Sequence, residues 1–135
     1  MRWKPNAAIV LMMFCLSFCA RAAEPEQSRC NFNGSQHDIN DCAALTFQKA
    51  DKDMNLLYQR QLKKLGKVNQ ERLRASQRAW LAYRDKACEY EAGPASTQQS
   101  FWIGTDLLCR AKLTAERRDL LEQYTACDSD GGCPH

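Results

Sequence analysis

Apolar residues recur at three- and four-residue steps along three stretches of this chain, and this spacing predicts three amphipathic helices. The first stretch begins at Asn40 or Asp41, either of which is a good N-cap, and ends at Gly66. The opposite face of this helix is polar, so only one side is expected to be buried. Its apolar positions are Ala43, Phe47, Ala50, Met54, Leu57, Tyr58, Leu62 and Leu65.

A second helix is predicted from about Asn69 to Ala92, where Gly93 and Pro94 stop it. Because only residues 66–69 connect it to the first helix, the two helices are expected to form an antiparallel hairpin. This hairpin is the predicted frame of the domain.

A third helix is predicted after a polar loop over residues 93–100. It begins between Ser100 and Thr105 and ends near Tyr124. No stretch of the chain alternates like a strand, so the predicted fold is an all-α domain in which the third helix packs alongside the hairpin. The apolar stripe of this helix contains Leu108, Cys109, Leu113, Leu120, Leu121 and Tyr124.

The first 22 residues have the pattern of a secretory signal peptide. Arg2 and Lys4 precede an apolar run over residues 7–20, and small residues surround the expected cleavage site near Ala22 or Ala23. The run is shorter than the roughly 20 residues that a bilayer core requires. We therefore expect a protein that is exported to the periplasm or beyond the cell, with no membrane span in its mature form.

A lipid anchor is the alternative to simple cleavage. Residues 16–19 end in Cys19 and have the outline of a lipoprotein cleavage site. Phe18 argues against this interpretation, because the residue before such a cysteine is normally small. We therefore do not expect a lipoprotein.

Removal of the signal peptide changes the charge of the chain. The full chain has 19 Lys and Arg residues and 16 Asp and Glu residues, a formal net charge of +3. Residues 1–22 contain three of the bases, Arg2, Lys4 and Arg21, and no acid, so the mature chain has 16 of each. This balance gives no reason to expect nucleic acid or an anionic membrane surface as the partner. The mature chain is short enough to be one domain with a modest core.

Six cysteines remain after residue 22, and an even number in a small exported domain predicts three disulfides. The first would hold an irregular lead-in over residues 23–40 on the helical domain of residues 41–126, and the last would close a tail over residues 127–135. About 15 pairings are open in principle. The sequential one is predicted: Cys30 with Cys42, Cys88 with Cys109, and Cys127 with Cys133.

The sequence offers little that could perform catalysis or hold a metal ion. There is no Cys-x-x-Cys pair, and His37 and His135 have no ligand spacing to the cysteines, which argues against zinc. Asp128 and Asp130 lack the further oxygen ligands of a calcium loop. No serine or cysteine stands in a nucleophile setting. We therefore expect no cofactor, no metal and no enzymatic activity.

The most unusual polar residues lie in the second predicted helix. Gln77 and Arg84 fall at helical spacing with Trp80 between them on the face that should be packed. Buried polar groups need partners, and Asp51 and Asn55 of the first helix are natural ones for Arg84 and Gln77 respectively. An interhelical polar lock is the favoured interpretation, and contact with a ligand is the alternative.

These residues resemble the motifs of the LprI-type lysozyme inhibitor family. The match runs from about Cys30 to Leu121, most of the mature chain, and the combination of three spaced motifs is more specific than any one of them. The motif residues are Asp51, Asn55 and Tyr58 in the first helix; Gln77, Trp80, Tyr83, Arg84, Asp85 and Cys88 in the second; and Cys109, Leu113, Thr114, Arg117 and Leu121 in the third.

The resemblance implies an exported bacterial envelope protein that binds a protein partner, with a lysozyme or related muramidase as the expected target. Such an enzyme has a cleft lined by carboxylates, to which an inhibitor would offer Lys or Arg. Its outer surface is often basic, so the alternative is that Asp128 and Asp130 steer the approach. Two alternatives stay open: an immunity or accessory protein against another periplasmic toxin or enzyme, and a structural adaptor of the envelope. The motif residues look mostly structural, so the resemblance assigns no partner-binding residue, and Cys127 and Cys133 depart from the family pattern.

Overall fold

The computed structural model describes residues 30–94 and 100–126, which form three helices and no strand. The helices are α1 (Gln36–Lys64), α2 (Lys67–Ala92) and α3 (Ser100–Ala126). The predicted all-α class is therefore confirmed. None of these helices, within the ranges described, is long and apolar enough to cross a membrane. The predicted signal peptide over residues 1–22 and the tail over residues 127–135 lie outside the described residues.

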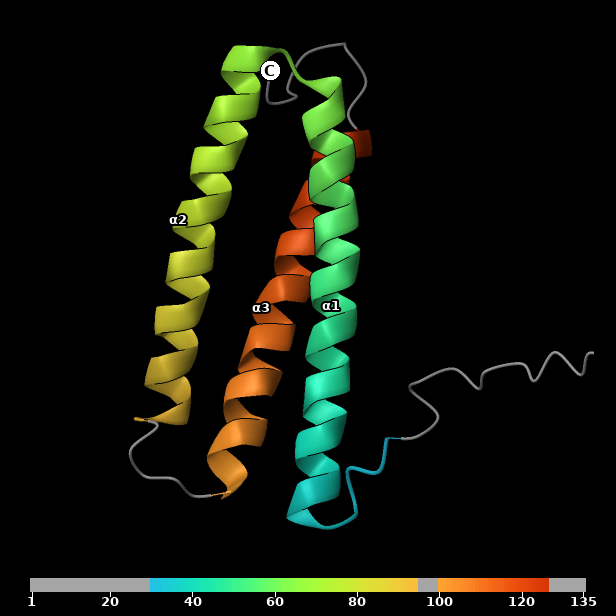
Figure 1. Cartoon of the computed structure of the whole chain (residues 1–135), viewed down its shortest axis with the longest axis vertical. Helices are drawn as coiled ribbons and strands as arrows, with labels where there is room; N and C mark the ends of the chain where they lie inside the picture. Colours follow the sequence, from blue (N-terminus) through green and yellow to red (C-terminus); the bar gives the residue numbers. More distant parts are fainter. Residues whose placement is uncertain (1–29, 95–99, 127–135) are drawn as a thin grey trace, which may run out of the picture.

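The connection between α1 and α2 is only Leu65 and Gly66, so these helices run antiparallel as predicted. α3 lies beside α1 and runs in the same direction (Figure 1). At one end of this pair Asn40 Nδ2 donates to the carbonyl oxygen of Ser100, 2.9 Å away. At the other end Lys64 Nζ donates to the carbonyl oxygen of Thr125 at 2.6 Å. α3 therefore follows α1 along its whole length.

Small residues allow α1 and α3 to approach closely. Ala43 and Ala50 of α1 are buried, as are Gly104 and Ala111 of α3. A Cβ on Gly104 would lie 2.8 Å from Asn40 Oδ1, which is too close for any other residue without a shift of the Asn40 side chain. The close packing of these two helices makes α3 a central element rather than an addition to the hairpin.

The hydrophobic core lies among the three helices and confirms most of the stripe predicted for α1. Leu108 was predicted to be buried, but the structure leaves it 38% exposed. The physical reason is that α3 contacts both other helices, so its buried positions are spread around the helix and include polar residues. Met54, Leu62, Leu73 and Leu121 form the buried core, with Leu57, Tyr58, Leu65, Trp80 and Tyr124 packed against it.

The start of α1 differs from the prediction. The helix begins at Gln36, so the placing of residues 36–40 in an irregular lead-in is wrong. Ser35 is the N-cap: its Oγ accepts from the backbone N–H of Asp38, and its own N–H donates to Asp38 Oδ2 at 2.8 Å. This reciprocal cap satisfies two backbone donors that the end of a helix leaves unpaired. The two Ser35 donors also lower the pKa of Asp38.

α2 begins at Lys67, two residues before the predicted N-cap, and its N-cap residue Gly66 offers no side chain to bond the first turn. Asn69 lies inside the helix, where its Oδ1 accepts from Arg72 Nη1 at 3.2 Å. The predicted end at Ala92 is confirmed. Gly93 follows it with a φ of 79°, in the left-handed region that favours glycine.

Candidate functional site

Most of the motif residues meet inside the bundle in one group of polar side chains, which we call the polar layer. Its members are Asp51, Gln77, Arg84, Asp85, Asp106, Arg110, Thr114 and Arg117. Arg84 lies at its centre, with a side chain that is 9% exposed. Its Nε and Nη2 donate to Asp85 Oδ1 at 3.0 and 2.9 Å, and its Nη1 donates to Thr114 Oγ1 of α3 at 3.4 Å. Asp51 Oδ1 of α1 lies 3.8 Å from Nη1, which confirms the predicted pairing of Arg84 with Asp51.

Two aromatic rings complete the surroundings of Arg84. The guanidinium carbon lies 5.3 Å from the centre of the Phe47 ring and 5.4 Å from that of Trp80. Rings at these distances attract a cation through their negative faces. The buried charge therefore has carboxylates, a hydroxyl and aromatic faces around it, and it ties all three helices together.

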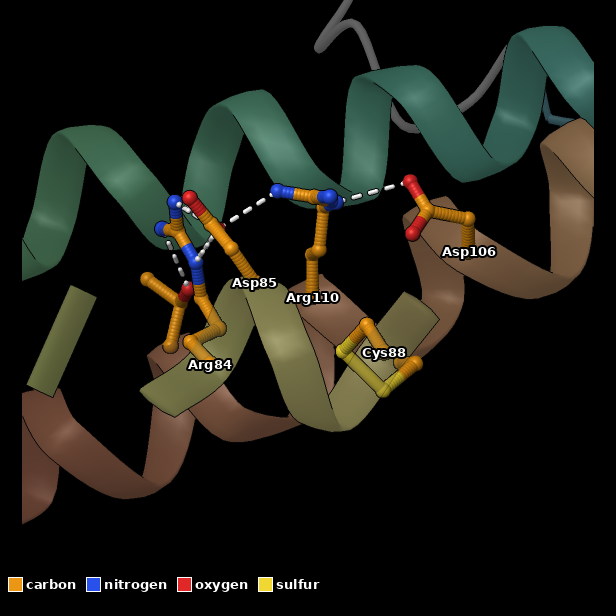
Figure 2. The surroundings of a disulfide bond; sticks show 7 residues. Arg84, Asp85, Cys88, Asp106 and Arg110 are labelled. Carbon is orange, nitrogen blue, oxygen red and sulfur yellow. Dashed lines mark hydrogen bonds and ion pairs between the residues drawn. A yellow bond between two sulfur atoms is a disulfide. The ribbon is translucent and has the colours of Figure 1, made fainter. Parts of the chain in front are cut away.

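The chain of ion pairs continues from Asp85 toward the end of α2 (Figure 2). Arg110 Nη1 donates to Asp85 Oδ1 at 2.6 Å, and Arg110 Nε donates to Asp106 Oδ2 at 2.7 Å. The hydrogen bond to Asp106, followed by the charges of Asp106 and Asp85, raises the pKa of Arg110 against the opposing effect of burial. The second carboxylate oxygen of Asp106, Oδ1, is buried with no hydrogen-bond partner.

Sequence reasoning missed Arg110 and Asp106 as members of this layer. The signal was present, because an acid and a base four residues apart in a helix commonly pair. It was overlooked because neither residue belongs to the quoted motifs.

A disulfide between Cys88 and Cys109 lies beside the ion pairs and joins α2 to α3, as predicted. Cys30 and Cys42 are not bridged in the structure. A hydrogen bond with Cys42 is the main cause that raises the pKa of the Cys30 thiol to about 11. Because the two thiols are neighbours, the bridge between them stays a prediction. Cys127 and Cys133 lie outside the described residues.

A second buried arginine lies in the same layer, nearer the hairpin. Arg117 Nε donates to Gln77 Oε1 at 3.0 Å, and Arg117 Nη2 donates to Ser76 Oγ at 3.3 Å. Its guanidinium also faces the Trp80 ring at 5.8 Å. Gln77 Nε2 in turn donates to Met54 Sδ at 3.0 Å. Burial lowers the pKa of Arg117.

Three motif residues have other surroundings. The predicted pairing of Asn55 with Gln77 is wrong: Asn55 is exposed and donates to Asp51 Oδ2 at 2.8 Å. The two positions are four residues apart on α1, so the amide reaches its own helix more easily than α2. Tyr58 is half-buried against the core. Tyr83 is 61% exposed on α2, outside the polar layer.

The polar layer uses its own donors and acceptors almost completely, so it is a lock between helices and offers little to a ligand. In the part of the chain that the structure describes, no group of three His, Cys, Asp or Glu residues is placed to hold a metal ion. A binding function therefore has to be sought on the exposed surface.

The sequence of this chain is similar to those of known proteins. The family model described as "Lysozyme inhibitor LprI" matches residues 28–121. An uncharacterized protein of Rhizobium meliloti (strain 1021) is 32% identical over 132 residues, which cover 86% of this chain and 94% of the relative. No solved structure matches the chain. The match to the family model covers more than half of the chain, and the chain therefore belongs to the lysozyme inhibitor LprI family.

Proposed function

We propose that the mature chain is an exported inhibitor that binds a lysozyme and blocks its action on the bacterial cell wall. The observation that carries this proposal is the match of residues 28–121 to a family described as lysozyme inhibitors. The signal-peptide pattern of residues 1–22 supports export to the compartment where such an enzyme would be met.

The architecture supports binding by a rigid surface. The disulfide between Cys88 and Cys109 and the ion pairs around Arg84 hold the helices in one arrangement. A protein with a rigid binding surface loses less conformational freedom on association, which favours affinity. The protein partner is therefore expected to meet exposed side chains on an unchanged helical frame.

The test is the lysis of a peptidoglycan suspension by a c-type lysozyme in the presence of the oxidised chain from Ala23 onward. We expect inhibition that rises with the molar ratio and saturates near one inhibitor per enzyme. The matched control is the same chain with Cys88→Ser and Cys109→Ser, which should inhibit less under conditions where its helices melt.

Absence of inhibition of c-, g- and i-type lysozymes would overturn this proposal. An immunity protein against another envelope toxin would then be sought by capture with the purified chain, and an envelope adaptor by co-purification without inhibition of any enzyme.

A further inference from the structure

The end of the bundle where α1 turns into α2 has an unbalanced charge, although the mature chain has equal numbers of acids and bases. Between Asp53 and Arg84 the sequence contains seven bases and a single acid, Glu71. All seven bases are exposed in the structure. We call them the basic tip: Arg60, Lys63, Lys64, Lys67, Arg72, Arg74 and Arg78.

None of these bases forms an ion pair with a carboxylate among the described residues, although Glu71 of α2 and Glu116, Asp119 and Glu122 of α3 are exposed toward the same end of the bundle. The eight ion pairs of residues 30–94 and 100–126 all lie elsewhere on the bundle. Three bases of the tip donate hydrogen bonds to neutral groups: Lys64 donates to a backbone carbonyl, and Arg72 and Arg74 donate to side-chain amides. By contrast, five bases outside the tip have a carboxylate partner. The tip therefore has an excess of positive charge that no ion pair neutralises within the described residues.

The start of α2 adds to this positive field. Its N-cap is Gly66, which makes no side-chain cap, and its first turn contains no acidic residue. The unpaired N–H groups of a helix start carry a partial positive charge and favour anions. Lys67 stands at the first position of the helix, where a base is least favourable. Such a local conflict is often found at functional sites.

We propose, resting on the proposed function above, that the basic tip is the surface that enters the cleft of the target lysozyme and faces its carboxylates. Glycosidases of this class work with two carboxylic side chains that flank the bond to be cleaved. A positively charged hairpin is complementary in charge to such a negatively charged cleft. Figure 1 shows the connected end of α1 and α2, where the chain reverses over two residues; the basic tip extends from this connection along the first half of α2.

An anionic membrane fits the tip less well. A helix that binds at a membrane surface normally combines its bases with a broad apolar face. At the tip, Val68 is the only strongly exposed large apolar side chain among residues 60–78 of the described chain. The charge therefore favours a protein cleft over a lipid surface.

The experiment compares two triple variants that change the net charge equally. The tip variant carries Lys63→Glu, Lys67→Glu and Arg74→Glu. Its matched control carries Lys52→Glu, Lys86→Glu and Lys112→Glu, which are also exposed and lie outside the tip. Circular dichroism first establishes that both variants keep their helices. Binding to c-, g- and i-type lysozymes is then measured by titration calorimetry, and inhibition by the lysis of peptidoglycan.

We expect the tip variant to bind at least about tenfold more weakly than the unchanged chain, and the control to stay within about threefold, because a charged pair at an interface contributes most where the charges meet. A lysozyme with both catalytic carboxylates changed to amides should bind the unchanged chain more weakly. The unchanged chain should also be retained on a carboxymethyl matrix despite its zero formal net charge, and the tip variant should not.

Other outcomes overturn the inference. If the unchanged chain inhibits and the tip variant inhibits equally well, the proposed function stands and the tip is not its surface. Loss of binding with Tyr83→Ala alone would move the interface to the exposed face of α2. Tip-dependent sedimentation with phosphatidylglycerol vesicles, without binding to any lysozyme, would replace the enzyme by a lipid surface. Absence of both inhibition and binding would overturn the inference together with the proposed function.

Discussion

The two ends of α2 differ in how their basic side chains are paired. One end carries the disulfide, and the other begins at the hairpin. At the disulfide end, Arg84 and Arg110 are buried or half-buried and each contacts carboxylates. At the hairpin end, seven exposed bases have no carboxylate partner among the described residues. The first end holds its charges in ion pairs, and the second leaves its charges exposed to solvent.

This difference separates the two roles of basic residues in a small exported domain. A buried arginine with several partners fixes how helices meet, whereas exposed lysines and arginines without partners create a field that reaches beyond the protein. The comparison predicts that substitutions at the disulfide end lower the free energy of unfolding. Chosen substitutions at the tip should raise it while they weaken binding.

The largest effect is expected from loss of the disulfide. The double change Cys88→Ala and Cys109→Ala should lower the free energy of unfolding by about 3 kcal/mol, because the bridge closes a loop with a sequence separation of 21 residues. Urea unfolding followed by circular dichroism measures this. The reduced unchanged chain is the control and should lose at least as much, because reduction also opens the other two predicted bridges. An unchanged midpoint in the double variant would show that the ion pairs alone hold this end together.

The next largest effect is expected for Arg84→Ala, which should cost about 2 kcal/mol because it leaves Thr114 and the rings of Phe47 and Trp80 without their central partner. Arg78→Ala removes an exposed arginine of the same helix and should change stability by less than about 0.5 kcal/mol. Chemical denaturation of both variants gives the comparison. Equal losses would contradict the assignment of Arg84 to a buried lock.

Much of the disulfide end could be predicted from the sequence. Helical spacing placed Arg84 on the packed face of α2 and Asp51 opposite it, and the position of the cysteines near adjacent helix ends favoured the pairing of Cys88 with Cys109. These inferences worked because each depends on periodicity along one helix and on one antiparallel connection. Both properties are local, so a single sequence shows them.

The features that were missed depend on three-dimensional packing or on the choice of cap. Burial of Thr114 and exposure of Leu108 follow from the place of α3 between two helices, which periodicity along α3 does not show. The early start of α1 follows from a cap in which Asp38 takes the place that Glu or Gln usually has. The basic tip was hidden because residues 23–135 contain equal numbers of acids and bases, although the bases cluster between Asp53 and Arg84.

At the hairpin end, Gln61→Met should raise the free energy of unfolding by about 1 kcal/mol. Gln61 is 4% exposed and its Oε1 is buried with no hydrogen-bond partner, which is costly for a polar atom. Gln59→Met at an exposed position of the same helix is the control and should have little effect. Thermal unfolding measures both. The cavity of about 210 Å³ beside this side chain is lined by Gln61, Leu65, Asn69, Arg72, Leu73, Ser76 and Tyr124.

A loss of stability in Gln61→Met would contradict that expectation. It would show that the oxygen is hydrogen-bonded in solution, which requires the side chain to shift toward the adjacent pocket, where there is room for a water molecule. The buried polar atoms of the hairpin end would then have more hydrogen-bond partners than the protein side chains provide. The contrast with the disulfide end would rest on the charges only.

The smallest effect gives the sharpest separation of stability from binding. Val68 is 63% exposed in the first turn of α2, which has no acid and no side-chain cap. Val68→Glu should raise the free energy of unfolding by about 0.5 kcal/mol, because a negative charge is favourable at a helix start and lies four residues before Arg72. Val68→Lys removes the same side chain and is the matched control, with no such gain.

Inhibition of lysozyme by these two variants should follow the opposite order. Val68→Glu adds a negative charge to the basic tip and should weaken inhibition, whereas Val68→Lys should preserve it. Thermal unfolding and the lysis assay are run on the same preparations, so each variant is its own control for folding. If the more stable variant is also the better inhibitor, the field of the tip does not govern binding, and the charges there have to be explained by another partner.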